Sequence, residues 1–107
     1  MKDVEFLPVS FAGSLTVSNI ETAQAELGAA VRQSSSVLID LGGVSEADLT
    51  FIQLIEAARR RVSETGGELT LRDPADGAVL EVLRRGGFLD DDGSDRAKFW
   101  LKEATQQ

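Results

Sequence analysis

The chain has 107 residues, a formal net charge of −7 and neither histidine nor cysteine. This length suits one domain with one modest core, and without cysteine the chain has no disulfides and no cysteine metal sites. The lack of histidine excludes Ser-His-Asp and Cys-His nucleophiles, and the acidic excess disfavours binding to a phosphate backbone.

The composition therefore closes most of the ordinary routes to catalysis, although carboxylates and lysines could still do acid–base work. We expect a protein that is not an enzyme, with no catalytic residue, no cofactor, no metal site and no nucleic-acid partner. No stretch approaches the roughly 20 apolar residues of a membrane span, so direct membrane insertion is not expected. The first residues include Asp3 and Glu5 and no long apolar run, which is unlike a signal peptide. The simplest location for such a chain is the cytoplasm.

Apolar residues recur from Val4 to Phe11, and Pro8 interrupts them. Because proline cannot donate a hydrogen bond to a neighbouring strand, we predict one or two short strands here, with Pro8 at a sheet edge or turn. Ser18 and Glu21 then have the spacing of a capping box, which predicts the start of a first helix. Apolar residues at helical spacing carry this helix to about residues 32–34.

A second strand and a second helix follow. Residues 37–41 form a short apolar run that is typical of a strand covered on both faces, and the two glycines after it are expected to end the strand. Asp48 is a good N-cap. Apolar residues at helical spacing from Leu49 to Val62 predict the helix, which Gly66 should end.

The remaining elements are shorter. Residues 68–72 alternate between polar and apolar side chains and predict a strand. Asp73 followed by Pro74 predicts the start of a third helix. Residues 90–107 are expected to form an acidic loop and a tail helix near residues 96–103. Phe99 and Trp100 in this tail either cap the core or contact a partner, and the sequence leaves both alternatives open.

Strands and helices alternate along the chain, which predicts an α/β fold. We expect a small mixed four-stranded sheet covered by three to four helices. No linker or internal repeat divides the chain, so residues 1–107 are expected to form a single domain.

Four segments stand out by their order and spacing: residues 11–16, 36–41, 44–55 and 66–88. Together they resemble the STAS domain, a module of anti-sigma-factor antagonists and of the cytoplasmic tails of sulfate transporters. The first segment is similar to the family's strand before the first helix, and the second to its central strand with a terminal Asp-Leu. The third is similar to the Asp-Ser-Ser-Gly-Leu motif that opens a helix, and the fourth to a glycine pair before a strand and a later helix.

The resemblance implies a STAS-like fold and a working surface at the turn of residues 48–51. In the family, a partner kinase that is also the anti-sigma factor phosphorylates the hydroxyl directly after the motif aspartate. Asp48 matches that aspartate, but Leu49 stands at the phosphoacceptor position and Phe51 replaces the usual glycine. Thr50 matches the second hydroxyl position and is the candidate phosphosite. The partner-binding residues implied are Ser45, Ala47, Asp48, Leu49, Thr50 and Phe51.

The function implied is that of a protein-interaction module in a bacterial signalling pathway, either sigma-factor regulation or a chemotaxis-like system. The expected partner is a protein similar to an anti-sigma kinase, or another signalling subunit. Because Leu49 replaces the phosphoacceptor, the turn is expected to act as a docking surface rather than a phospho-switch. The alternative is a small STAS subunit of an ABC-type complex that transports lipids or other substrates across a membrane. A homodimer is also left open.

Whether the turn can contact a partner depends on which side chains face solvent. Successive helical positions point apart, so of Leu49 and Phe51 we expect one in the core and the other exposed. For Asp48, a purely structural role as an N-cap is the competing interpretation.

Overall fold

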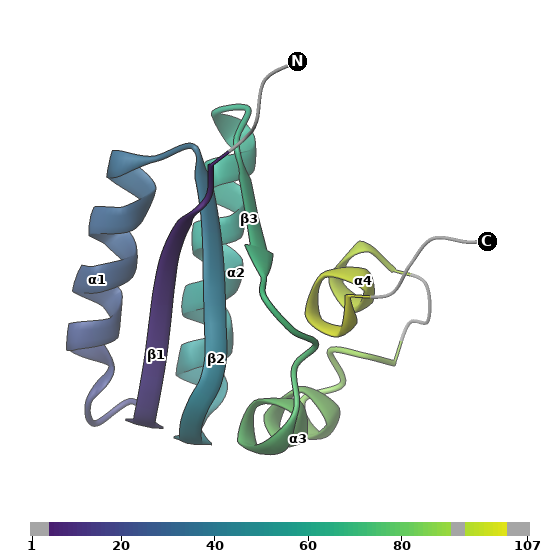
Figure 1. Ribbon diagram of the computed structural model, residues 1–107. Coiled ribbons are helices and arrows are strands. Elements are labelled where there is room, and N and C mark those ends of the chain that lie inside the picture. The colour runs from purple at the N-terminus through teal and green to yellow at the C-terminus, as the bar shows by residue number, and fades with distance from the viewer. Residues whose placement is uncertain (1–4, 91–93, 103–107) are drawn as a thin grey trace.

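The computed structural model describes residues 5–90 and 94–102. They form a small three-stranded sheet and four helices that pack around it (Figure 1). In chain order the elements are β1 (Leu7–Leu15), α1 (Ile20–Gln33), β2 (Ser36–Ala47), α2 (Leu49–Glu64), β3 (Glu68–Leu71), α3 (Gly77–Arg85) and α4 (Asp95–Leu101). The strand order is β1-β2-β3, and both strand pairs are parallel. Two successive right-handed crossovers in this order place α1 and α2 on the same face of the sheet.

The predicted α/β class is confirmed, but the mixed four-stranded sheet is corrected. Within residues 5–90 and 94–102 the sheet has three strands, all parallel. The segment predicted as one or two short strands is the single strand β1, because two shifts in pairing register, after Ser10 and after Gly13, accommodate its irregularities without a chain reversal. Pro8 lies in this edge strand, as predicted.

The strand β2 also runs further than expected, through both glycines to Ala47. Gly43 is needed there because β1 comes very close to it. A Cβ atom at Gly43 would lie 2.9 Å from the Cβ atom of Ala12, a distance that real side chains essentially never adopt. Gly43 thus allows the two strands to stay together to their ends.

The helix starts follow the local prediction only in part. Asp48 caps α2 as predicted, but the N-cap of α1 is Asn19 and not Ser18. The side chain of Asn19 turns back instead, and its Oδ1 accepts a hydrogen bond from the Thr16 backbone N–H at 2.8 Å. The third helix begins at Gly77 and not at Asp73.

One buried cluster receives side chains from all seven elements. Trp100 is fully buried, and Phe99 packs edge-on against it with ring centroids 5.1 Å apart. The indole Nε1–H of Trp100 donates to Glu56 on α2 at 3.0 Å. Of the two alternatives for these aromatic residues, the structure therefore supports the one in which the tail caps the core.

Candidate docking site

At the start of α2, both carboxylate oxygens of Asp48 accept hydrogen bonds from backbone N–H groups. Oδ1 of Asp48 accepts the backbone N–H of Thr50 at 2.9 Å, which is the N-cap bond. Oδ2 accepts the backbone N–H of Val17 at 2.9 Å. Val17 lies in the loop between β1 and α1, so Asp48 joins this loop to the first turn of α2.

This joint brings two exposed apolar side chains to the same end of the molecule, where β1 and β2 end and α1 and α2 begin (Figure 1). Val17 is 68% exposed and Leu49 is 46% exposed. They are the only exposed large hydrophobic residues of the described chain. We call these two residues the Val17–Leu49 surface. The sequence prediction included Leu49 but missed Val17, because no local pattern indicates that Asp48 binds the loop before α1.

The other predicted site residues lie around this surface in different degrees of burial. Ser45 is exposed, whereas Ala47 and Thr50 are half-buried. The backbone N–H of Thr50 is occupied by the Asp48 cap. Within residues 45–50, Leu49 is therefore the side chain that offers most apolar area to a partner.

Phe51 is a correction to the predicted set of contacts. Its side chain is fully buried, and its ring packs edge-on against Phe11 of β1 with the centroids 5.5 Å apart. A side chain in this position cannot reach a docked protein, because the helix points it into the sheet. The expectation that one of Leu49 and Phe51 is core and the other exposed is confirmed.

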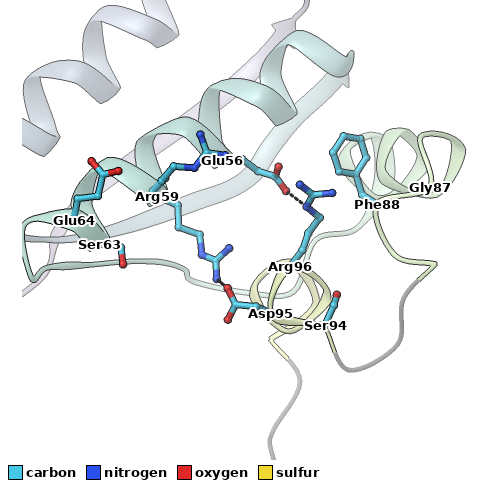
Figure 2. Close-up of a pocket in the computed structure, with 10 residues that line it drawn as sticks. Glu56, Arg59, Ser63, Glu64, Gly87, Phe88, Ser94, Asp95 and Arg96 are labelled. Atoms are coloured by element: carbon cyan, nitrogen blue, oxygen red, sulfur yellow. Dashed lines mark hydrogen bonds and ion pairs between the residues drawn. The ribbon is translucent and has the colours of Figure 1, made fainter.

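A second feature, a groove of about 610 Å³, lies along the C-terminal half of α2 beside α4 (Figure 2). Opposite charges face each other across it. Arg96 pairs with Glu56 at 2.8 Å, and Arg59 pairs with Asp95. The guanidinium of Arg59 also lies over the ring of Phe99, 4.5 Å from its centroid. Because these charges neutralise one another, we interpret the groove as part of the interface between α4 and α2 and not as a ligand site.

Two kinds of feature are absent from the described residues. No helix among them has the length and apolar character needed to cross a bilayer. The same residues contain no group of three or more acidic side chains placed to hold a metal ion.

The chain matches a family of known domains. A family model described as "Mlab, STAS domain" matches residues 3–90, which is most of the chain and includes the Val17–Leu49 surface. Domains of this kind generally act by binding other proteins and not as enzymes, and anti-sigma-factor antagonists are among them. No curated protein and no solved structure matches the chain.

Proposed function

Because the chain belongs to the STAS domain family, we propose that it docks a protein partner in bacterial signalling, through the Val17–Leu49 surface. In this proposal it resembles an anti-sigma-factor antagonist or a chemotaxis-like adaptor. It works without the usual phosphoacceptor, since Leu49 stands in that position. Ser45, Ala47 and Thr50 form the rim of the contact.

The observation that carries this proposal is the exposure of two large apolar side chains beside the family's motif aspartate. Fully burying an exposed Val or Leu side chain is worth about 1.5–3 kcal/mol. Val17 is 68% exposed and Leu49 46% exposed, so a partner that covers both would gain roughly half of that value from each. Protein interfaces draw most of their energy from a few such central residues. No phosphate is needed for a contact of this kind.

Thr50 remains the candidate phosphosite of this surface. A phosphate there would add about −1.5 to −2 charges at the first turn of a helix, beside the apolar contact. Such a charge would weaken an apolar interface by the cost of removing it from water. If a cognate kinase labels the turn, we expect the label to disappear in Thr50→Ala, since Leu49 has no hydroxyl. Labelling that persists in Thr50→Ala would exclude Thr50 as the sole acceptor.

The alternative is that the chain is a small subunit of an ABC-type membrane transport complex. The apolar, exposed Leu49 favours it, because a permanent subunit contact needs no reversible modification. In that case the partner would be the ATPase subunit, and the same Val17–Leu49 surface would be covered in the assembled complex.

Site-specific photo-crosslinking in the native host separates these functions. A photoreactive residue replaces Leu49, and a control chain carries it at Arg61, an exposed position late in α2. Capture at Leu49 of a kinase-like anti-sigma factor or signalling subunit, identified by mass spectrometry, supports the signalling proposal. Capture of an ATPase subunit supports the alternative, and capture of a second copy indicates a homodimer. Equal capture from both positions would contradict a docking surface at Leu49.

The captured partner then allows a direct mutational prediction. Leu49→Asp should weaken its binding by about tenfold or more, because a charge replaces an apolar contact at the centre of the interface. The free energy of unfolding should change by less than about 0.5 kcal/mol, since the side chain is exposed. Calorimetry and urea unfolding measure the two quantities. Leu49→Met keeps the apolar contact and should bind almost normally, and unfolding of Leu49→Asp would show that Leu49 stabilises the core.

A further inference from the structure

Basic side chains are unevenly distributed along this chain. Residues 3–31 and 33–58 contain no lysine or arginine. These stretches supply β1, β2, the first half of α2 and all of α1 except Arg32 in its last turn. They include the strand ends and helix starts around the Val17–Leu49 surface. Among the acidic residues of these stretches, three lie at the strand ends and helix starts: Glu21 in the first turn of α1, Glu46 near the end of β2, and Asp48.

The charges of Glu21 and Glu46 are not neutralised within the described chain. Both side chains are exposed, and no lysine or arginine among residues 5–90 and 94–102 forms an ion pair with either. The Ser14 hydroxyl donates to Oε1 of Glu46 at 2.9 Å, which holds this carboxylate at the ends of the paired strands. The hydrogen bond orients the charge but leaves it negative.

The arginines of α2 are too far along the helix to compensate for these acids. Arg59 follows Leu49 by ten residues, which is about 15 Å of helix, and it is already paired with Asp95. At physiological ionic strength, interactions between exposed charges are largely screened beyond about 8 Å. In α3, which also packs on α2 and β2, Arg84 and Arg85 lie in the last turn, and Arg85 pairs with Glu81.

We propose that the partner of the Val17–Leu49 surface presents an apolar side chain flanked by lysine or arginine residues. This inference rests on the proposed docking function and specifies its partner. The apolar side chain is seated against Val17 and Leu49, and the flanking cations face Glu46 and Glu21. Complementary charges at an interface rim steer encounter and select partners, while the buried apolar centre supplies most of the affinity.

Three synthetic amphipathic helices of equal length test this chemistry on the full-length, ¹⁵N-labelled protein. The first has a leucine stripe flanked by lysines, the second has glutamates in place of the lysines, and the third has serines in place of the leucines. We expect only the first helix to shift the amide signals of Val17, Asp48 and Leu49 at low salt. High salt should weaken the binding of this helix. Equal shifts with the glutamate or serine helix, or shifts centred on another surface, would overturn the proposal.

A graded set of charge variants makes the test quantitative. Glu46→Gln should weaken the binding of the helix that carries leucines and lysines. Glu46→Lys should weaken this binding further, to about one fifth of the original affinity. The matched control is Glu68→Lys, which makes the same change at an exposed position at the start of β3. Circular dichroism checks that each variant is folded. Equal losses from Glu46→Lys and Glu68→Lys would show that only the net charge matters and would overturn the proposed rim.

The native partner separates failure of this inference from failure of the docking function. If Leu49 captures a partner whose affinity is unchanged or improved by Glu46→Lys, the docking function stands and the basic partner is excluded. If Leu49→Asp leaves the affinity for the captured partner unchanged, the docking function itself fails. Loss of affinity in both variants supports both.

Discussion

At the scale of single residues, Asp48 connects the core structure to the surface. One of its oxygens caps α2 and the other holds the loop that carries Val17. The same side chain therefore stabilises the helix and fixes the position of an exposed contact. The structural interpretation, an N-cap, is confirmed, whereas a role of Asp48 in partner binding stays a prediction.

Replacing this carboxylate should cost stability. We expect Asp48→Ala to lower the free energy of unfolding by about 1–2 kcal/mol, because it removes a helix cap and a second hydrogen bond to the backbone. Asp48→Asn keeps one acceptor oxygen, so its free energy of unfolding should fall by less. Urea unfolding followed by circular dichroism gives both values, and an unchanged midpoint in Asp48→Ala would contradict the two-bond role.

At the scale of elements, α4 is part of the core although it lies beyond the family match, which ends at residue 90. Trp100 is fully buried, and its backbone carbonyl accepts the N–H of Ala75 at 2.8 Å. Two ion pairs and the indole hydrogen bond then attach α4 to α2. The tail thus completes the packing of the preceding elements instead of trailing from them.

Removal of the indole should therefore have a large effect. Trp100→Ala is expected to lower the free energy of unfolding by about 3–5 kcal/mol, the usual range for a buried aromatic side chain. Arg96→Ala removes an ion pair to the mostly buried Glu56 and a contact over the Phe88 ring, and it should cost less, about 1–2 kcal/mol. Thermal and urea unfolding of both variants measures the difference. Similar losses would mean that α4 is held mainly by its charges.

The same elements show what could be predicted from sequence and what could not. The start of α2 was predictable because an N-cap and helical periodicity are local signals. The start of α3 was missed because the N–H of Ala75, just after Asp73-Pro74, is bound by the carbonyl of Trp100, and this contact depends on the tail. The Ser18 capping box failed because Asn19 binds the Thr16 backbone instead.

For the candidate site, Asp48 and Leu49 were predictable from the motif, and the burial of one of two neighbouring apolar residues followed from helix geometry. The sequence could not indicate that Phe51 is the buried one, since this depends on the position of Phe11 in β1. Val17 was missed for the same reason, because its contact with Asp48 joins segments that are distant in sequence.

At the scale of the whole molecule, two asymmetries coincide. The helices α1 and α2 lie on one face of the sheet. Because α1 follows β1 and α2 follows β2, both helices begin at the end of the sheet where these parallel strands end. The stretches that build this end carry acids and no cations, whereas the basic residues concentrate from Arg59 onward. One end of the molecule is therefore acidic, and the remainder carries both signs of charge.

The net charge of −7 predicts how salt affects stability. Screening of repulsion among the acids should raise the free energy of unfolding by about 0.5–1 kcal/mol between low and high salt, since the exposed ion pairs that salt weakens are worth little. Urea, which is uncharged, is the suitable denaturant. The double variant Glu21→Gln/Glu46→Gln removes two negative charges and should show a smaller salt effect. A stability that falls with salt would show that the ion pairs dominate.

The position of the chain's single tryptophan has a practical consequence. Its indole is sealed from water and bonded to Glu56, about two turns along α2 from Leu49. The fluorescence of Trp100 therefore reports whether α4 is packed against the core. A partner that covers Leu49 should leave the emission maximum in place, whereas detachment of the tail should shift it to longer wavelength. Complex formation and loss of structure can then be told apart in one sample without a label.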